Sequence, residues 1–193
     1  MNKVEVFTNE LKYIKNETMV KDIKYLIENL PDYFFEIPAA STGKYHPAYA
    51  QGEGGLVRHT KAAVRIGYEL LANPLIGGKY TDTEKDLMLM GIIIHDGFKC
   101  GITKEKYTRV DHPLLIANYI KENKPNLSMA EEELELMAKV VASHMGPWNK
   151  DFNDNEVLPI PKSKYESFVH MCDYLASKKF IKIEFDKENN IVE

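Results

Sequence analysis

Histidine and aspartate residues recur along this sequence at positions that could together build a metal site. Five of the six histidines fall in predicted helices or at their ends, and one is followed at once by an aspartate. A mixture of imidazole and carboxylate ligands suits manganese, iron, cobalt, nickel or zinc better than calcium. Such cations activate water for hydrolysis. The candidate ligands, in chain order, are His59, His95, Asp96, His112, His144 and Asp173.

The doublet His95-Asp96 is the centre of this pattern. Adjacent side chains on a helix diverge by about 100°, so the two do not stack, but both can reach a metal near the helix end. The apolar run 87–94 precedes them, and a helix that is apolar on every side is a buried one. A buried helix end that carries ionisable groups needs a partner for its charge, and a cation would supply it.

Helices are expected to position all of these residues. Taken singly, each histidine is better explained as a core or surface residue, so the joint pattern carries the argument. The helix with His59 should begin near Gly55, and the next should be capped within 81–84. Ser128 and Glu131 form a capping-box pattern before the helix that ends at His144. The predicted ligand helices span about residues 55–71, 81–96, 113–122, 128–144 and 163–179.

The remaining segments complete an all-α architecture. Residues 4–30 are typical of two amphipathic helices with a break at Asn16, and residues 41–55 of an irregular loop. Residues 180–193 alternate in a way that suits a short C-terminal β-hairpin. A length of 193 residues favours one globular domain, 1–193, and 44% hydrophobic with 28% charged residues is typical of a folded chain.

Composition and charge exclude several classes of protein. The first residues carry no export signal, and the longest apolar run has eight residues, short of the roughly 20 that cross a bilayer. We therefore expect a cytoplasmic protein without membrane contact. Two cysteines are too few for a disulfide framework. The net charge of −4 argues against affinity gained by neutralising many nucleic-acid phosphates.

Four local segments around the candidate ligands carry a family resemblance. They are residues 54–60 (GGLVRHT), 94–101 (IHDGFKCG), 142–146 (ASHMG) and 170–173 (HMCD). Together they resemble the motifs of the HD-domain superfamily of metal-dependent phosphohydrolases, whose minimal pattern is a histidine, a His-Asp doublet and a late aspartate. The resemblance covers about residues 46–180. It implies a single HD-type phosphohydrolase domain, folded as an HD-domain helical bundle.

The resemblance also implies two divalent transition-metal ions, from manganese, iron, cobalt, nickel or zinc. Members of the superfamily with two further histidines between the doublet and the last aspartate hold two metals, and His112 and His144 match those positions. Asp96 would bridge the two ions. The implied ligands of the first metal are His59, His95, Asp96 and Asp173, and those of the second are Asp96, His112 and His144.

Catalytic roles are expected for Asp96, Lys99 and His170. Lys99 follows Asp96 by three residues, close enough to place an ammonium against a phosphoryl oxygen, although a plain surface lysine fits equally well. His170 precedes Asp173 by three residues and therefore shares its helix face. It could touch substrate or protonate the leaving group, and support of Asp173 is the competing interpretation.

Three further residues are expected to contact substrate together with Lys99. His46 lies in the loop before the first ligand helix and could line the entrance, although loop histidines are more often exposed. Arg109 could bind a phosphate, and ordinary surface charge is the alternative. Trp148 could stack on a base, while packing would explain it more simply.

The sequence thus predicts an enzyme that cleaves a phosphate ester of a nucleotide, a cyclic nucleotide or a short oligonucleotide through a metal-activated hydroxide at a two-metal site. A 3'-5' exonuclease on RNA or DNA ends is the second hypothesis, because residues 54–60 and 161–173 resemble HD-domain exoribonucleases most closely. Those proteins carry a separate nucleic-acid-binding domain that this sequence does not show. The third hypothesis is a metal-binding regulatory module without turnover.

Overall fold

A computed structural model describes residues 2–40 and 46–192, so residues 41–45 of the expected loop lie outside the described residues. The described part is all-α, as predicted, and contains no named strand. Short 3-10 turns occupy Glu5–Phe7, Asp32–Phe35, Ala48–Ala50 and Lys124–Asn126. The α-helices are α1 (Thr8–Leu11), α2 (Glu17–Glu28), α3 (Gly55–Ala72), α4 (Pro74–Gly77), α5 (Asp82–Ile94), α6 (His112–Glu122), α7 (Glu131–Ala142) and α8 (Lys164–Ala176).

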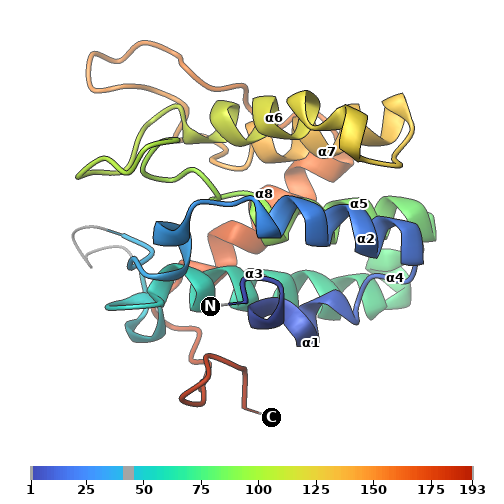
Figure 1. Cartoon of the computed structure of the whole chain (residues 1–193), viewed down its shortest axis with the longest axis horizontal. Coiled ribbons are helices and arrows are strands. Elements are labelled where there is room, and N and C mark those ends of the chain that lie inside the picture. Colours follow the sequence, from blue (N-terminus) through green and yellow to red (C-terminus); the bar gives the residue numbers. More distant parts are fainter. Residues whose placement is uncertain (1, 41–45, 193) are drawn as a thin grey trace.

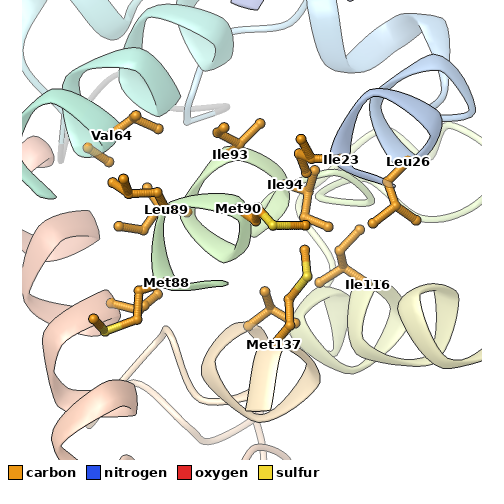
Figure 2. Packing of buried hydrophobic residues seen from close by; sticks show 14 of the residues in the cluster. Ile23, Leu26, Val64, Met88, Leu89, Met90, Ile93, Ile94, Ile116 and Met137 are labelled. Atoms are coloured by element: carbon orange, nitrogen blue, oxygen red, sulfur yellow. The ribbon is translucent and has the colours of Figure 1, made fainter. Parts of the chain in front are cut away.

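Helix α5 is the centre of the hydrophobic core. Its residues from Asp86 to Ile94 are all buried, as the apolar run predicts. Figure 2 shows α5 with side chains of the neighbouring helices around it, among them Ile23 of α2, Val64 of α3 and Met137 of α7. Burial on every side holds the end of α5 in place, and that end leads directly into His95 and Asp96.

Local start signals account for three of the helices. Thr81 caps α5 and Glu84 completes the capping box, while Ser163 and Glu166 do the same for α8. Asn16 caps α2 by accepting from two backbone N–H groups, so the predicted break between the N-terminal helices is confirmed. These caps set where α5 and α8 begin, and therefore which of their residues reach the candidate site.

The predicted capping box in front of α7 is wrong. Helix α7 begins at Glu131, and the backbone N–H groups of Ser128 and Met129 donate to the buried carboxylate of Asp22 on α2. Because this distant carboxylate already binds those N–H groups, the helix starts three residues later than predicted. Helix α7 ends at Ala142, which leaves His144 in the turn beyond it.

The C-terminal tail folds back against the start of α3. One antiparallel bridge joins Phe185 to Ile191, in place of the two paired strands of a hairpin. The tail contacts α3 through Asn189 and Asn190, which accept hydrogen bonds from Arg58 and Lys61.

Long connecting segments gather at one end of the bundle. In Figure 1 the segments that follow α5 and α7, drawn in lime and orange, lie on the left with residues 46–54, which precede α3. Among the described residues no helix is long and apolar enough to cross a membrane. The candidate ligands come from the helix ends at this end of the bundle.

Candidate metal centre

The six predicted ligands converge from five helices. His59 lies in the second turn of α3, His112 is the first residue of α6, and Asp173 lies near the end of α8. The doublet directly follows α5, and His144 lies just beyond α7. Each of the four histidines and Asp96 is at most 1% exposed, while the Asp173 side chain is 20% exposed. Solvent therefore reaches the cluster from the side of Asp173.

His59, His95 and Asp173, which belong to the first predicted ligand set, lie close enough together to bind a single metal ion. The Nε2 atom of His59 is 2.9 Å from Oδ1 of Asp173, and Nε2 of His95 is 3.5 Å from the same oxygen. The same His95 atom is 3.4 Å from Oδ2 of Asp96. These atoms surround a common point between the ends of α3, α5 and α8.

Asp96 also faces the second predicted set. Its Oδ1 atom is 2.9 Å from Nε2 of His112 and 3.6 Å from Nε2 of His144, and these two nitrogens are 3.3 Å apart. Its other oxygen faces His95. A carboxylate with one oxygen toward each group has the arrangement that a bridging ligand requires.

Backbone carbonyls orient three of the rings. The Nδ1 atoms of His95, His112 and His144 lie 2.6 to 2.7 Å from the carbonyl oxygens of Ile92, Arg109 and Val141, each three residues earlier in the chain. A carbonyl only accepts, so each Nδ1 carries the proton and each Nε2 of a neutral ring presents a lone pair. Imidazoles that ligate metals are commonly held in this way.

Buried polar atoms without partners test whether this cluster fits a metal. Nε2 of His95 and Oδ1 of Asp96 are buried and have no hydrogen-bond partner, although unpaired buried polar groups are costly. Two ligands about 2.1 Å from one metal lie about 3.0 to 3.4 Å apart, depending on the coordination angle. The distances between neighbouring ligand atoms in this cluster, from 2.9 to 3.6 Å, span this range. The residues present therefore fit divalent transition metals.

Electrostatics within the cluster favour ionised carboxylates. Burial alone would raise the pKa of Asp96 and of Asp173, but Lys99 and His95 for Asp96, and His59 and His95 for Asp173, hold both well below the usual value. Burial opposes a charge on His95, yet the two carboxylates outweigh it and raise the pKa of this ring to about 10. Burial lowers the pKa of His144, which favours its neutral, ligating form.

Lys99 lies inside the centre. Its side chain is 11% exposed, and its Nζ atom is 2.5 Å from Oδ2 of Asp96. A plain surface lysine would be solvated, so the geometry favours the interpretation in which its ammonium acts at the site. In this structure that ammonium partly neutralises the aspartate.

His46 is half-buried at the wall of the centre, not exposed on a loop as histidines there commonly are. Its ring meets the ring of His59 edge-on at 4.9 Å between centroids, and its Nδ1 atom is buried without a hydrogen-bond partner. Burial and then the neighbouring His59 lower the pKa of His46 to about 3. It therefore faces the centre as a neutral ring.

His170 and Trp148 lie together on the outer side of His144. The Nδ1 atom of His170 donates to the backbone carbonyl of His144 at 2.7 Å, and no hydrogen bond to Asp173 is among its contacts. Its ring centroid is 6.1 Å from that of Trp148, which stacks on Tyr174 and is 55% exposed. The competing interpretation, in which His170 supports Asp173, therefore has no hydrogen bond between the two side chains in its favour.

Arg109 makes ion pairs at the surface. Its guanidinium contacts the Asp111 carboxylate at 2.8 and 2.7 Å and Glu105 at 2.6 Å. These carboxylates already neutralise the charge that a phosphate would need. The backbone of Arg109 has a clearer role, because its carbonyl orients the ring of His112.

Tyr174 is a site neighbour that the sequence alone does not single out, and Lys178, which the sequence shows only as part of a basic cluster, lies next to it. Tyr174 follows His170 by four residues, a spacing that places two side chains on one face of a helix and could have drawn attention to it. Lys178 lies beyond the end of α8, and its Nζ atom is 3.5 Å from the centroid of the Tyr174 ring. Only the packing of α8 against the segment after α7 brings these residues to Trp148.

Comparison with known proteins identifies distant relatives of one kind. The chain is 24% identical over 157 residues to the 3'-5' exoribonuclease YhaM of Listeria welshimeri, an alignment that covers 76% of this chain and 47% of the relative. It is 28% identical over 141 residues to the protein of that name from Shouchella clausii, with 69% and 41% covered. The YhaM protein of Halalkalibacterium halodurans is 23% identical over 188 residues, with 91% and 52% covered.

The chain spans about half the length of the curated relatives it matches. No family model matches the chain, and the search of solved structures gives no match.

Proposed function

We propose that this chain is an HD-type metal-dependent phosphohydrolase, a single domain over residues 1–193, that removes nucleotides from the 3' end of RNA. The observation that carries the proposal is the convergence of four buried imidazoles and two carboxylates from five helices, with three rings held so that Nε2 faces the centre. The relatives named exoribonucleases support RNA as the substrate. Those names fit the exonuclease hypothesis, and the assays below compare it with the mononucleotide one.

Two metals would be held by the residues described above. His59, His95, Asp96 and Asp173 would bind one ion, and His112 and His144 would share Asp96 with the other. Bound there, divalent cations would activate a water and stabilise negative charge on the phosphoryl oxygens. Manganese, iron, cobalt, nickel and zinc all suit this mixed ligand set.

The side chains around the metals would bind and orient the phosphate. Once cations neutralise Asp96, the ammonium of Lys99 would be free to contact a phosphoryl oxygen, where charge increases in the transition state. His46 and the partly exposed Asp173 would border the path by which substrate reaches the metals. His170 keeps its Nδ1 proton on the carbonyl of His144, so its Nε2 is the atom that would exchange a proton with the leaving group.

The first experiment measures metal and turnover on the same protein. Purified without chelator, the chain should contain about two transition-metal ions, and it should shorten a 5'-labelled oligoribonucleotide stepwise with release of 5'-mononucleotides. A chelator should abolish the activity, and manganese or another of these ions should restore it. Absence of metal and of turnover after reconstitution would contradict the proposal and favour a binding module.

A nucleotide or cyclic nucleotide phosphohydrolase is the second candidate. The net charge of −4 favours it, because tight binding of long polyanions usually needs positive charge. Parallel assays on mononucleotides and cyclic nucleotides separate the two. Turnover confined to these small substrates would replace RNA as the substrate while leaving the metal chemistry unchanged.

A further inference from the structure

Two stacked aromatic rings lie at the surface beside the candidate metal centre. The centroids of Trp148 and Tyr174 are 5.6 Å apart, and their planes are inclined by only 16°. Trp148 remains 55% exposed, although a tryptophan used only for packing would bury most of its surface. The described chain thus presents a large planar apolar surface to solvent at this point.

His170 connects this ring pair to the centre. Its ring lies 6.1 Å from Trp148 and 5.9 Å from Tyr174, and its Nδ1 atom donates to the carbonyl of His144. The ring packs so closely over Gly146 that a Cβ atom there would lie 2.2 Å from it. The stacked rings therefore have a defined position relative to a predicted metal ligand.

A positive charge accompanies the rings. The Nζ atom of Lys178 is 3.5 Å from the centroid of Tyr174 and 5.9 Å from that of Trp148. The exposed Lys179 follows it. Aromatic faces next to lysines are the combination that binds single-stranded nucleic acid, because bases stack on the rings while the cations attract the phosphates.

We propose that Trp148 and Tyr174 form a stacking platform for an unpaired nucleobase, with Lys178 next to the sugar-phosphate chain. This inference rests on the proposed function and deepens it, because it selects single-stranded RNA over duplex. A base paired within a duplex has no free face for the indole. The platform would hold a nucleotide near the 3' end while the adjoining phosphodiester lies at the metal centre.

The chain offers its own probe, because Trp148 is its only tryptophan. A short phosphorothioate-linked adenosine oligomer, which resists cleavage, should quench the intrinsic fluorescence of the intact protein. An abasic chain of equal length carries the same charge without bases and should leave the emission almost unchanged. Equal responses to the two chains, or no response to either, would overturn the platform.

Substitutions of Trp148 test the stacking of a base on its ring by a measurement that does not depend on tryptophan fluorescence. Binding of a dye-labelled adenosine oligomer, followed by anisotropy, should weaken about tenfold in Trp148→Ala, and Trp148→Phe should retain most of the affinity. Tyr68→Ala is the matched control. Tyr68 also stacks at the surface, on Tyr13 at 4.0 Å, but it lies nine residues beyond His59 on α3, roughly 13 Å along the helix. Unchanged affinity in Trp148→Ala would refute the platform.

The experiments can contradict the stacking platform and the proposed exonuclease activity independently of each other. Base-dependent quenching without RNA hydrolysis would support the platform and contradict the proposed exonuclease. Hydrolysis of RNA without base-dependent quenching would leave the enzyme proposal intact and overturn the platform.

Discussion

At the scale of single residues, Asp96 connects the two halves of the candidate centre. One of its oxygens faces His112 and His144, and the other faces His95 and Lys99. Asp96→Asn preserves the volume of the side chain but removes the negative charge that two cations would share. We expect the variant to lose bound metal and at least about 100-fold in activity.

Elemental analysis and the oligoribonucleotide assay measure both losses. Asp32→Asn is the matched control, because Asp32 is 80% exposed at its side chain and pairs with Lys3, which is not a predicted ligand. Full activity and full metal content in Asp96→Asn would refute the bridging role.

Gly146 leaves the space that the ring of His170 occupies beside the centre. Its φ of +61° lies in the left-handed region, and an added Cβ atom would meet the ring of His170. Gly146→Ala should therefore destabilise the fold by about 2 kcal/mol or more, measured by urea unfolding. Gly52→Ala is the control, since Gly52 has a similar φ of +69° but nothing within 4 Å of a Cβ atom. An equal loss of unfolding free energy in the two variants would mean that the contact with His170 does not contribute to the destabilisation.

At the scale of elements, a carboxylate from α2 defines the start of α7. Asp22 accepts from the N–H groups of Ser128 and Met129 while it is only 3% exposed. Asp22→Ala should cost about 1 to 3 kcal/mol in the free energy of unfolding, because it leaves buried donors unpaired. Ser128→Ala should cost little, since its hydroxyl does not cap the helix. A larger loss from Ser128→Ala, measured by thermal or urea unfolding, would favour the capping box expected from sequence.

Helix α3 carries a buried ion pair with the N-terminal segment. Lys61 is fully buried, and its Nζ atom lies 3.8 Å from the carboxylate of Glu10 and 3.0 Å from Oδ1 of Asn190. Lys61→Met would leave Glu10 buried without its cation, which should cost about 3 kcal/mol or more in unfolding free energy at pH 8. The double variant with Glu10→Gln removes both charges and should recover most of that loss.

The same pair gives the Lys61→Met variant a distinctive pH dependence. Burial raises the pKa of Glu10 above its usual 4.5, and Lys61 opposes this rise. As pH falls through the raised pKa toward 4.5, the folded protein binds a proton before the unfolded chain does, so stability increases. Without Lys61 the pKa rises further, and unfolding titrations should show a larger gain between about pH 8 and pH 5 than in the wild type. A variant whose stability does not change with pH in this way would contradict the assignment.

At the scale of the whole molecule, the centre joins five of the helices. Its predicted ligands come from the ends of α3, α5, α6, α7 and α8, and the unfolded chain does not hold them together. A metal at about 100 times its dissociation constant should add about 2.7 kcal/mol to the unfolding free energy, or roughly 5 to 10 °C in Tm. Differential scanning fluorimetry with and without chelator measures this shift. The shift should vanish in Asp96→Asn, and an unchanged Tm in the wild-type chain would argue against a metal that links the helices.

Local signals determined much of this protein from sequence alone. The apolar run of α5 predicted a buried helix, the expected break between the N-terminal helices falls at Asn16, and α5 is capped within the predicted segment 81–84. Such signals act between residues a few positions apart, so they are readable without the fold. The six candidate ligands follow from the joint pattern of histidines and aspartates and from its resemblance to HD-domain motifs, and the fold brings all six together.

Tertiary structure alone decided the contacts between distant segments. Asp22 accepts a hydrogen bond from the N–H group of Ser128, 106 residues away, and Trp148 meets Tyr174 only because α8 packs beside the segment after α7. The depth of His46 beside His59 likewise depends on how its loop lies against α3. Sequence patterns report which residues are available to bind a metal, a base or a backbone donor. Which of them meet is decided by packing, because side-chain contacts form between surfaces whose relative placement no local pattern encodes.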